Sequence, residues 1–192
     1  MKKNLFKGAL ASTVIVSLLS FTNVNAQEKK VEVKDSNIEW KGEKVTGSHE
    51  GTIDLKDGYF TMENGELKGG EFVMDMTSIT VTDLEGEDKG KLESHLKSDD
   101  FFGVNNHPTA KLVITSVAKK SNDTYGVVAD LTIKEKTNSI TFDLDMDKNS
   151  ASTELTIDRS KYDVRYGSGS FFDNLGDKTI YDNFELDVEL KF

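Results

Sequence analysis

The side chains that could support catalysis or metal binding are few and scattered in this sequence. Its three histidines are His49, His95 and His107, and no two of them are spaced as a metal-binding pair on one element. A His-Glu-x-x-His motif, which would hold zinc on one face of a helix, is absent. Each histidine therefore fits a structural or surface role better. His95 is the best placed of the three, because it falls where a short helix would meet the mouth of a β-barrel.

A run of acidic residues resembles a calcium-binding loop in composition only. Asp143, Asp145 and Asp147 alternate along the chain and are followed by Asn149. An EF-hand loop needs a glycine at its sixth position, and this sequence has Lys148 there. The acids fit better as the solvent-facing side of a strand, so we predict no metal site.

The remaining polar candidates do not form a catalytic set either. Ser168 and Ser170 lie in a Gly-Ser-Gly-Ser stretch that lacks the strand–Ser–helix pattern of a hydrolase nucleophile. Arg159, Lys161 and Arg165 either form surface ion pairs or rim a pocket and hold a polar head group. We therefore predict no catalytic residues and no cofactor. An enzyme that uses His49 or His95 with a nearby carboxylate stays open as an alternative.

The elements that carry these residues are predicted to be strands. Apolar and polar residues alternate, with the period of two that is typical of half-buried strands, in segments 37–41, 72–77, 125–133, 140–147, 155–158 and 184–192. Turn signals such as Asn64-Gly65 lie between these segments. About eight antiparallel strands follow, in a sandwich or a closed barrel. Residues 88–98 predict a short helix, and residues 160–179 a long loop rich in Gly, Asp, Ser and aromatic residues.

Composition and charge exclude several functional classes. The 192 residues include 34 acids against 24 lysines and arginines, a net charge of −10, and no cysteine. An acidic protein binds nucleic acids and anionic membrane surfaces poorly, because both carry negative charge themselves. Without cysteine, the chain has no disulfide, thiol nucleophile, cysteine-ligated zinc or iron–sulfur cluster.

The first 26 residues read as a cleavable signal peptide. Lys2, Lys3 and Lys7 precede an apolar stretch at 9–21, and Val24-Asn25-Ala26 fits the small-residue cleavage pattern. The apolar stretch is shorter than the roughly 20 residues of a membrane-spanning helix. We expect a mature protein of residues 27–192 that forms a single domain in the bacterial periplasm.

The mature chain resembles the YceI-like family, also called the polyisoprenoid-binding or lipid-binding YceI-like family. The matching segments are 36–40 (SNIEW), 47–51 (GSHEG), 67–79 (LKGGEFVMDMTSI), 92–102 (LESHLKSDDFF), 108–110 (PTA), 131–134 (LTIK), 158–160 (DRS) and 166–172 (YGSGSFF). They occur in the family's order across nearly all of residues 31–192. One departure is Glu135, which stands where family members usually have glycine.

The resemblance implies a lipocalin-like, extended eight-stranded antiparallel β-barrel, with the short helix and the long loop at its mouth. It also implies that a hydrophobic isoprenoid-type lipid, either a polyprenyl chain or an isoprenoid quinone, lies inside the barrel. The alternation then places the wall of the tunnel at Trp40, Phe72, Met74, Ile114, Phe142, Leu144 and Phe184. Aromatic residues of the two non-strand segments form the expected mouth: Phe101, Phe102, Tyr166, Phe171 and Phe172.

Two further interpretations stay open at this point. A stress-related structural protein would have a barrel filled by its own side chains, without a cavity, because an eight-stranded barrel is just wide enough for either arrangement. A homodimer is also compatible with the sequence. We expect no nucleic-acid partner and no stable insertion into a membrane.

Overall fold

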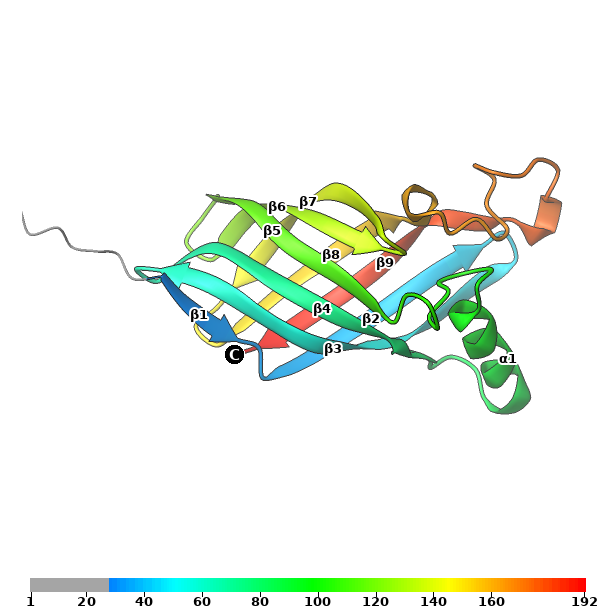
Figure 1. Ribbon diagram of the computed structural model, residues 1–192, viewed down its shortest axis with the longest axis horizontal. Coiled ribbons are helices and arrows are strands. Elements are labelled where there is room, and N and C mark those ends of the chain that lie inside the picture. The colour runs from blue at the N-terminus through cyan, green and yellow to red at the C-terminus, as the bar shows by residue number, and fades with distance from the viewer. Residues whose placement is uncertain (1–27) are drawn as a thin grey trace, which may run out of the picture.

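The computed structural model describes residues 28–192, and the predicted signal peptide lies outside this part of the chain. Nine strands, one α-helix and two short 3-10 helices make up the described chain (Figure 1). The strands are β1 (Glu28–Glu32), β2 (Asp35–Lys44), β3 (Gly47–Glu63), β4 (Glu66–Val81), β5 (Thr109–Lys119), β6 (Thr124–Ile133), β7 (Lys136–Met146), β8 (Ser150–Asp158) and β9 (Ile180–Lys191). The helices are α1 (Gly86–Lys97), η1 (Arg159–Tyr162) and η2 (Gly176–Lys178).

Eight of the strands form a closed antiparallel barrel, which confirms the predicted fold class. The ring runs β2-β9-β8-β7-β6-β5-β4-β3 and closes through the pairing of β3 with β2. The extra strand β1 pairs with the second half of β3, while β2 pairs with the first half of the same edge. β3 can serve both partners because it is 17 residues long. The predicted alternation corresponds to side chains that point into the barrel and out to solvent in turn.

Two hairpins turn through residues with positive φ. Asn64 and Gly65, the predicted turn between β3 and β4, have φ values of 52° and 82°. Lys134 and Glu135 connect β6 to β7 with φ values of 47° and 62°. Two-residue hairpin loops favour this left-handed geometry, which glycine and asparagine adopt most easily. Glu135 therefore occupies a position at which a side chain is costly.

The hydrogen-bonded pairing between neighbouring strands is incomplete between β7 and β8. The two strands pair only next to their hairpin, at Asp145 with Ser152 and at Met146 with Ala151. Farther along, the Thr153 hydroxyl donates a hydrogen bond to the Asp143 carbonyl at 2.7 Å. η1 then lies against β7, so a short helix stands where a strand ladder would otherwise continue. We call this incomplete boundary the β7–β8 seam.

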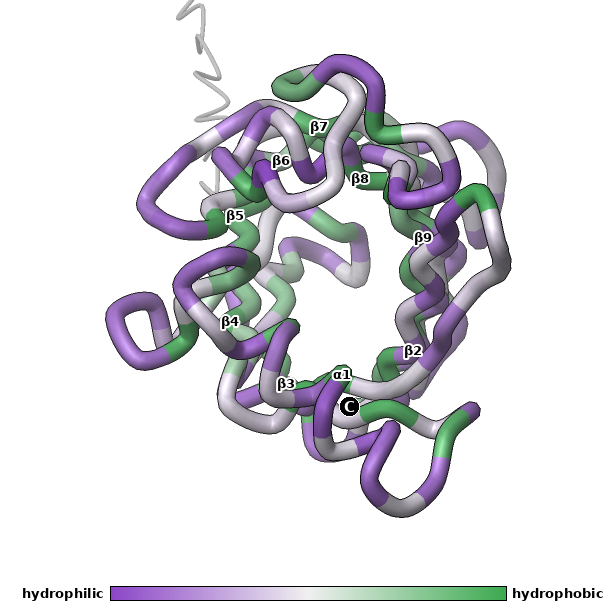
Figure 2. Tube along the Cα trace, turned by 90° about the vertical axis from the view of Figure 1, so that its right-hand side faces the viewer, coloured by the Kyte–Doolittle hydropathy of each residue, from purple (hydrophilic) through white to green (hydrophobic). Residues whose placement is uncertain are grey.

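Helix α1 lies at the rim of the barrel, beside the end of β4 (Figures 1 and 2). The carboxylate of Glu93 accepts hydrogen bonds from the Thr80 hydroxyl at 2.7 Å and from the Val81 amide at 3.0 Å. Leu96 on the same helix is buried against the core. The helix predicted at 88–98 is therefore confirmed, and it begins two residues earlier. The long predicted loop runs from η1 to β9 at the same end of the barrel (Figure 1).

Candidate functional site

The inside of the barrel contains two apolar cavities stacked along its axis. The first lies at the end that carries α1 and measures about 140 Å³. The second, about 90 Å³, lies deeper. Four residues line both: Ile38, Met74, Leu131 and Leu186. A dry cavity of roughly 150 Å³ lined by aliphatic and aromatic side chains holds a benzene-sized molecule. The two cavities therefore offer a divided apolar path for a narrow hydrophobic chain.

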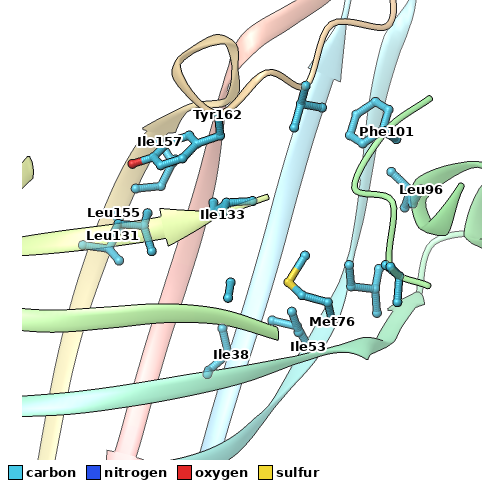
Figure 3. Close-up of a cluster of buried hydrophobic side chains, with 14 of the residues drawn as sticks. Ile38, Ile53, Met76, Leu96, Phe101, Leu131, Ile133, Leu155, Ile157 and Tyr162 are labelled. Carbon is cyan, nitrogen blue, oxygen red and sulfur yellow. The ribbon is translucent and has the colours of Figure 1, made fainter. Parts of the chain in front are cut away.

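The lining of the first cavity comes from strands on all sides and from the rim. Ile38, Ile53, Met76, Leu131 and Ile157 converge on it from five different strands (Figure 3). Leu96 of α1 and Phe101, which follows the helix, close the cavity near the rim (Figure 3). Met76 and Met74 add flexible thioether side chains that adapt to irregular ligands.

Nine of the predicted binding residues line these cavities. Those around the first cavity are Trp40, Met74, Phe101, Phe102 and Phe184. Those around the second are Phe72, Met74, Ile114, Phe142 and Leu144. The alternation of the strands therefore brings together every residue predicted for the tunnel wall.

Three predicted mouth residues lie elsewhere. Tyr166, Phe171 and Phe172 line neither cavity, and each side chain is substantially exposed on the loop before β9. Tyr166 packs edge-on against His95 of α1, with ring centroids 4.3 Å apart. This contact joins the loop to the helix at the rim. A role of these three residues in ligand binding stays a prediction.

Several lining residues were missed in the sequence, although their signal was present. Ile38, Met76, Leu131, Ile157 and Leu186 all lie on the inward side of predicted alternating segments. They were not distinguished from ordinary core residues, because a cavity wall and a filled core have the same periodicity.

Arg159 is the one charged residue among the lining of the first cavity. Its side chain is buried, and burial lowers the pKa of the guanidinium from its ordinary value. The guanidinium donates four hydrogen bonds to main-chain oxygens, those of Val164, Tyr166, Ile180 and Tyr181. Arg159 therefore anchors the loop to the start of β9. Its donors are engaged by the protein itself, so holding a polar head group is not its main role.

The two other predicted cations lie outside the cavities. Arg165 forms an ion pair with Asp163 and stacks over the ring of Phe171, 5.0 Å from the ring centroid. Lys161 is exposed, and its main-chain oxygen accepts a hydrogen bond from Asn138 of β7 at 3.0 Å.

None of the histidines lines either cavity. His49 Nδ1 lies 2.8 Å from the carboxylate of Asp83, and both side chains are partly exposed. The edge of the His95 ring meets Phe101 as well as Tyr166. Among residues 28–192, no cluster of three or more His, Asp or Glu side chains is arranged to hold a metal ion. None of the helices in this range has both the length and the apolar character needed to cross a bilayer.

Comparison with known proteins identifies the family. The family model described as the YceI-like domain matches residues 29–192, which is nearly the whole described chain. The chain belongs to the YceI-like family. A UPF0312 protein of Shewanella denitrificans is 31% identical over 144 residues, covering 73% of this chain and 71% of the relative. A UPF0312 protein of Staphylococcus epidermidis is 32% identical over 113 residues, covering 49% of this chain and 61% of the relative.

Solved structures of this family have the same fold. BcnA of Burkholderia cenocepacia aligns with a TM-score of 0.66 at 19% identity, over 81% of this chain and 94% of that one. A domain from Saccharophagus degradans, described as a polyisoprenoid-binding domain, aligns with a TM-score of 0.58 at 12% identity, over 84% and 95%. The YceI protein of Campylobacter jejuni gives 0.53 at 16% identity, over 100% and 98%. At sequence identities this low, the structural similarity establishes a shared barrel fold and nothing further.

Proposed function

We propose that this protein binds an isoprenoid-type lipid inside its barrel and acts as a carrier or sequestering factor in the periplasm. The observation that carries the proposal is the pair of stacked apolar cavities, which share Ile38, Met74, Leu131 and Leu186. A narrow, branched, water-insoluble chain matches a path of this kind, because its binding depends on apolar contact and needs few polar groups. Each methylene removed from water contributes roughly 0.8 kcal/mol.

Membership of the YceI-like family supports the same ligand class. The structural relative from Saccharophagus degradans is described as a polyisoprenoid-binding domain and has the same barrel. A polyprenyl chain and the tail of an isoprenoid quinone both satisfy the chemistry of the cavities. The head group would lie toward the rim, where Phe101 and Tyr181 line the first cavity.

The single tryptophan gives a direct test of binding. Trp40 lines the first cavity, and quinones quench indole fluorescence on contact, so a short-chain ubiquinone serves as the probe. We expect saturable quenching of Trp40 by ubiquinone with two isoprene units, and competition by farnesol, which does not quench. A titration without saturation, or without competition by farnesol, would reject the proposed cavity.

A matched pair of variants separates the cavity from the outer surface. Phe142→Asp puts a carboxylate beside the second cavity, and Thr141→Asp puts the same group on the exposed side of the same strand. We expect Phe142→Asp to weaken quinone binding by at least about tenfold, because the ligand would have to share an apolar site with a charge. Thr141→Asp should bind as the original chain does. Circular dichroism of both variants verifies that the barrel has formed.

The proposed location rests on residues 1–26 and has its own test. Export through a cleavable signal would produce a periplasmic protein that begins at Gln27. Intact-mass measurement of the protein from a periplasmic extract checks this. Retention of residues 1–26, or recovery from the cytoplasm alone, would contradict the proposed location.

A further inference from the structure

The exposed apolar surface of the described chain is concentrated at one end of the barrel. Among residues 28–192, five large hydrophobic side chains are exposed, each between 39% and 50%. They are Val45, Tyr166, Phe171, Phe172 and Tyr181. All five lie in or next to the connections at the end that carries α1, the end that faces the viewer in Figure 2. We call these five residues the apolar rim.

Main-chain contacts hold the segments of the apolar rim together at this end of the barrel. The Val45 amide donates a hydrogen bond to Thr179 at 3.1 Å, and the Ile180 amide donates to Gly167 at 2.8 Å. These bonds tie the β2–β3 turn and the long loop to the start of β9. Tyr181 belongs both to the apolar rim and to the lining of the first cavity. The exposed apolar surface therefore adjoins the residues that line the first cavity.

The long loop that carries Tyr166, Phe171 and Phe172 is electrically neutral, unlike the chain as a whole. In residues 160–181 three cations, Lys161, Arg165 and Lys178, balance three acids, Asp163, Asp173 and Asp177. The whole chain carries −10, so the excess of acid lies outside this segment. A neutral surface rich in Phe and Tyr suits the interface between lipid head groups and acyl chains, where aromatic residues are enriched. The excess of acid elsewhere in the chain does not suit an anionic bilayer surface.

We propose that the apolar rim docks transiently on the surface of a zwitterionic bilayer, so that the lipid passes between bilayer and cavity without crossing water. Phe171 and Phe172 enter the head-group region, and the end of the barrel that contains the first cavity then faces the membrane. This inference rests on the proposed function, because it supplies the step by which an insoluble ligand is loaded and released. It requires peripheral contact only, without a membrane-spanning segment.

Transfer kinetics test the docking step. The protein is loaded with ubiquinone of four isoprene units added from ethanol and is mixed with empty phosphatidylcholine vesicles, and recovery of Trp40 fluorescence reports release. If docking precedes release, the rate rises in proportion to vesicle concentration. The rate should change little between about 0.05 and 0.5 M salt, because the contact is apolar and the loop is neutral.

Two variants isolate the rim from the cavity. The double variant Phe171→Ser and Phe172→Ser, loaded with quinone from ethanol to the same occupancy as the original chain, should release it to vesicles at least about tenfold more slowly. The control is Tyr59→Ser, which removes an outer-surface aromatic near β1, at the opposite end of the barrel. It should transfer at the original rate.

The possible failures are distinguishable. Unchanged transfer by the double variant, or a rate independent of vesicle concentration in the original chain, would overturn the docking proposal while leaving ligand binding intact. A protein that binds quinone from ethanol and never delivers it to protein-free vesicles would point to a macromolecular partner at the rim instead, which also overturns the proposal. Absence of binding in the ethanol arm would reject the proposed function itself.

Discussion

The carboxylate of Asp182 lies 3.4 Å from the buried guanidinium of Arg159, at the point where β9 begins. Arg159 is also hydrogen-bonded to a main-chain oxygen near the start of the long loop, that of Val164, and to one just after it, that of Ile180. Asp182 in turn accepts a hydrogen bond from the Ser170 hydroxyl at 2.6 Å. This pair therefore fixes both ends of the loop that carries most of the apolar rim.

Replacing Arg159 with methionine should destabilise the protein strongly. The variant leaves buried carbonyl oxygens without donors and Asp182 without its counter-charge. We expect the free energy of unfolding to fall by about 3–5 kcal/mol, as measured by urea denaturation. Asp182→Asn should cost less, because the Asp182 side chain is partly exposed and keeps its bond from Ser170. A loss below about 1 kcal/mol for Arg159→Met would contradict the anchoring role.

Tyr162 gives a prediction at alkaline pH. Its side chain belongs to the buried cluster of Figure 3, and its hydroxyl has no hydrogen-bond partner among residues 28–192. Burial, with the nearby charge of Asp158, raises its pKa from 10.0 to about 12. The folded state thus holds this proton more tightly than the unfolded state does. The associated stability is complete below pH 10 and is lost between pH 10 and 12, by up to roughly 3 kcal/mol. Tyr162→Phe should lack this loss and should be as stable as the original chain, or slightly more stable, at pH 7. Urea midpoints of both proteins from pH 8 to 12 provide the check, and parallel curves would refute the assignment.

The β6–β7 turn predicts a stabilising substitution. Glu135 has a φ of 62°, a conformation that glycine adopts without the steric cost that a side chain imposes. Glu135→Gly should raise the free energy of unfolding by about 1 kcal/mol. Thermal unfolding measures the effect. A lower melting temperature would show that the Glu135 side chain makes a compensating contact.

Leu131 is predicted to limit the length of the bound chain. It is buried and lines both cavities, so Leu131→Ala should merge them at a stability cost of about 2–5 kcal/mol. The ratio of affinities for four-isoprene over two-isoprene ubiquinone should rise by about tenfold, because additional methylenes become buried. Leu67→Ala is the control, since Leu67 is also buried and lines neither cavity. An identical change in both variants would argue against a constriction at Leu131.

Glu93 should make the docking of α1 sensitive to acid. Hydrogen bonds from the Thr80 hydroxyl and the Val81 amide lower the pKa of Glu93 from its ordinary value of 4.5. The ionised carboxylate therefore stabilises the docked helix above pH 4.5, and this stabilisation is lost as the pH falls below that value. The protection factors of the α1 amides, which are exchange rates corrected for the intrinsic pH dependence, should fall at acid pH. In Glu93→Ala, these protection factors should already be low at pH 7 and should show no further fall below pH 4.5.

The barrel was predictable from the sequence because its strands are half-buried. Phe142 and Leu144 alternate with Thr141 and Asp143, and the structure places the first two against the second cavity. β1 was missed because residues 28–32 contain one apolar residue, Val31, and join the sheet mainly through main-chain pairing with β3. A strand with a single apolar residue shows no alternation of apolar and polar residues, so it cannot be recognised by this pattern.

The positions of the predicted mouth residues were harder to infer from the sequence than those of the residues in the cavity wall. The family pattern indicated that Phe101 and Phe171 belong to the same region, but Phe101 is buried and Phe171 is exposed. This difference depends on the path of the loop, which Arg159 fixes through the main-chain oxygens of Ile180 and Tyr181, more than 20 residues away in the sequence. Local residue patterns carry no information about such contacts.

The β7–β8 seam makes the barrel easier to widen than a barrel whose neighbouring strands are all fully paired. A ring of strands joined throughout by ladder hydrogen bonds has a fixed girth, because widening it at any point would break a row of bonds. β7 and β8 are paired only beside their hairpin. Phe142 of β7 and Leu155 of β8 line the second cavity on either side of the unpaired part of the seam. Moving β7 and β8 apart at the seam would require shifts of η1 and of a few side-chain contacts only. Widening the barrel along this line would therefore break few ladder hydrogen bonds, so the proposed lipid would be accommodated there while the rest of the sheet stays paired.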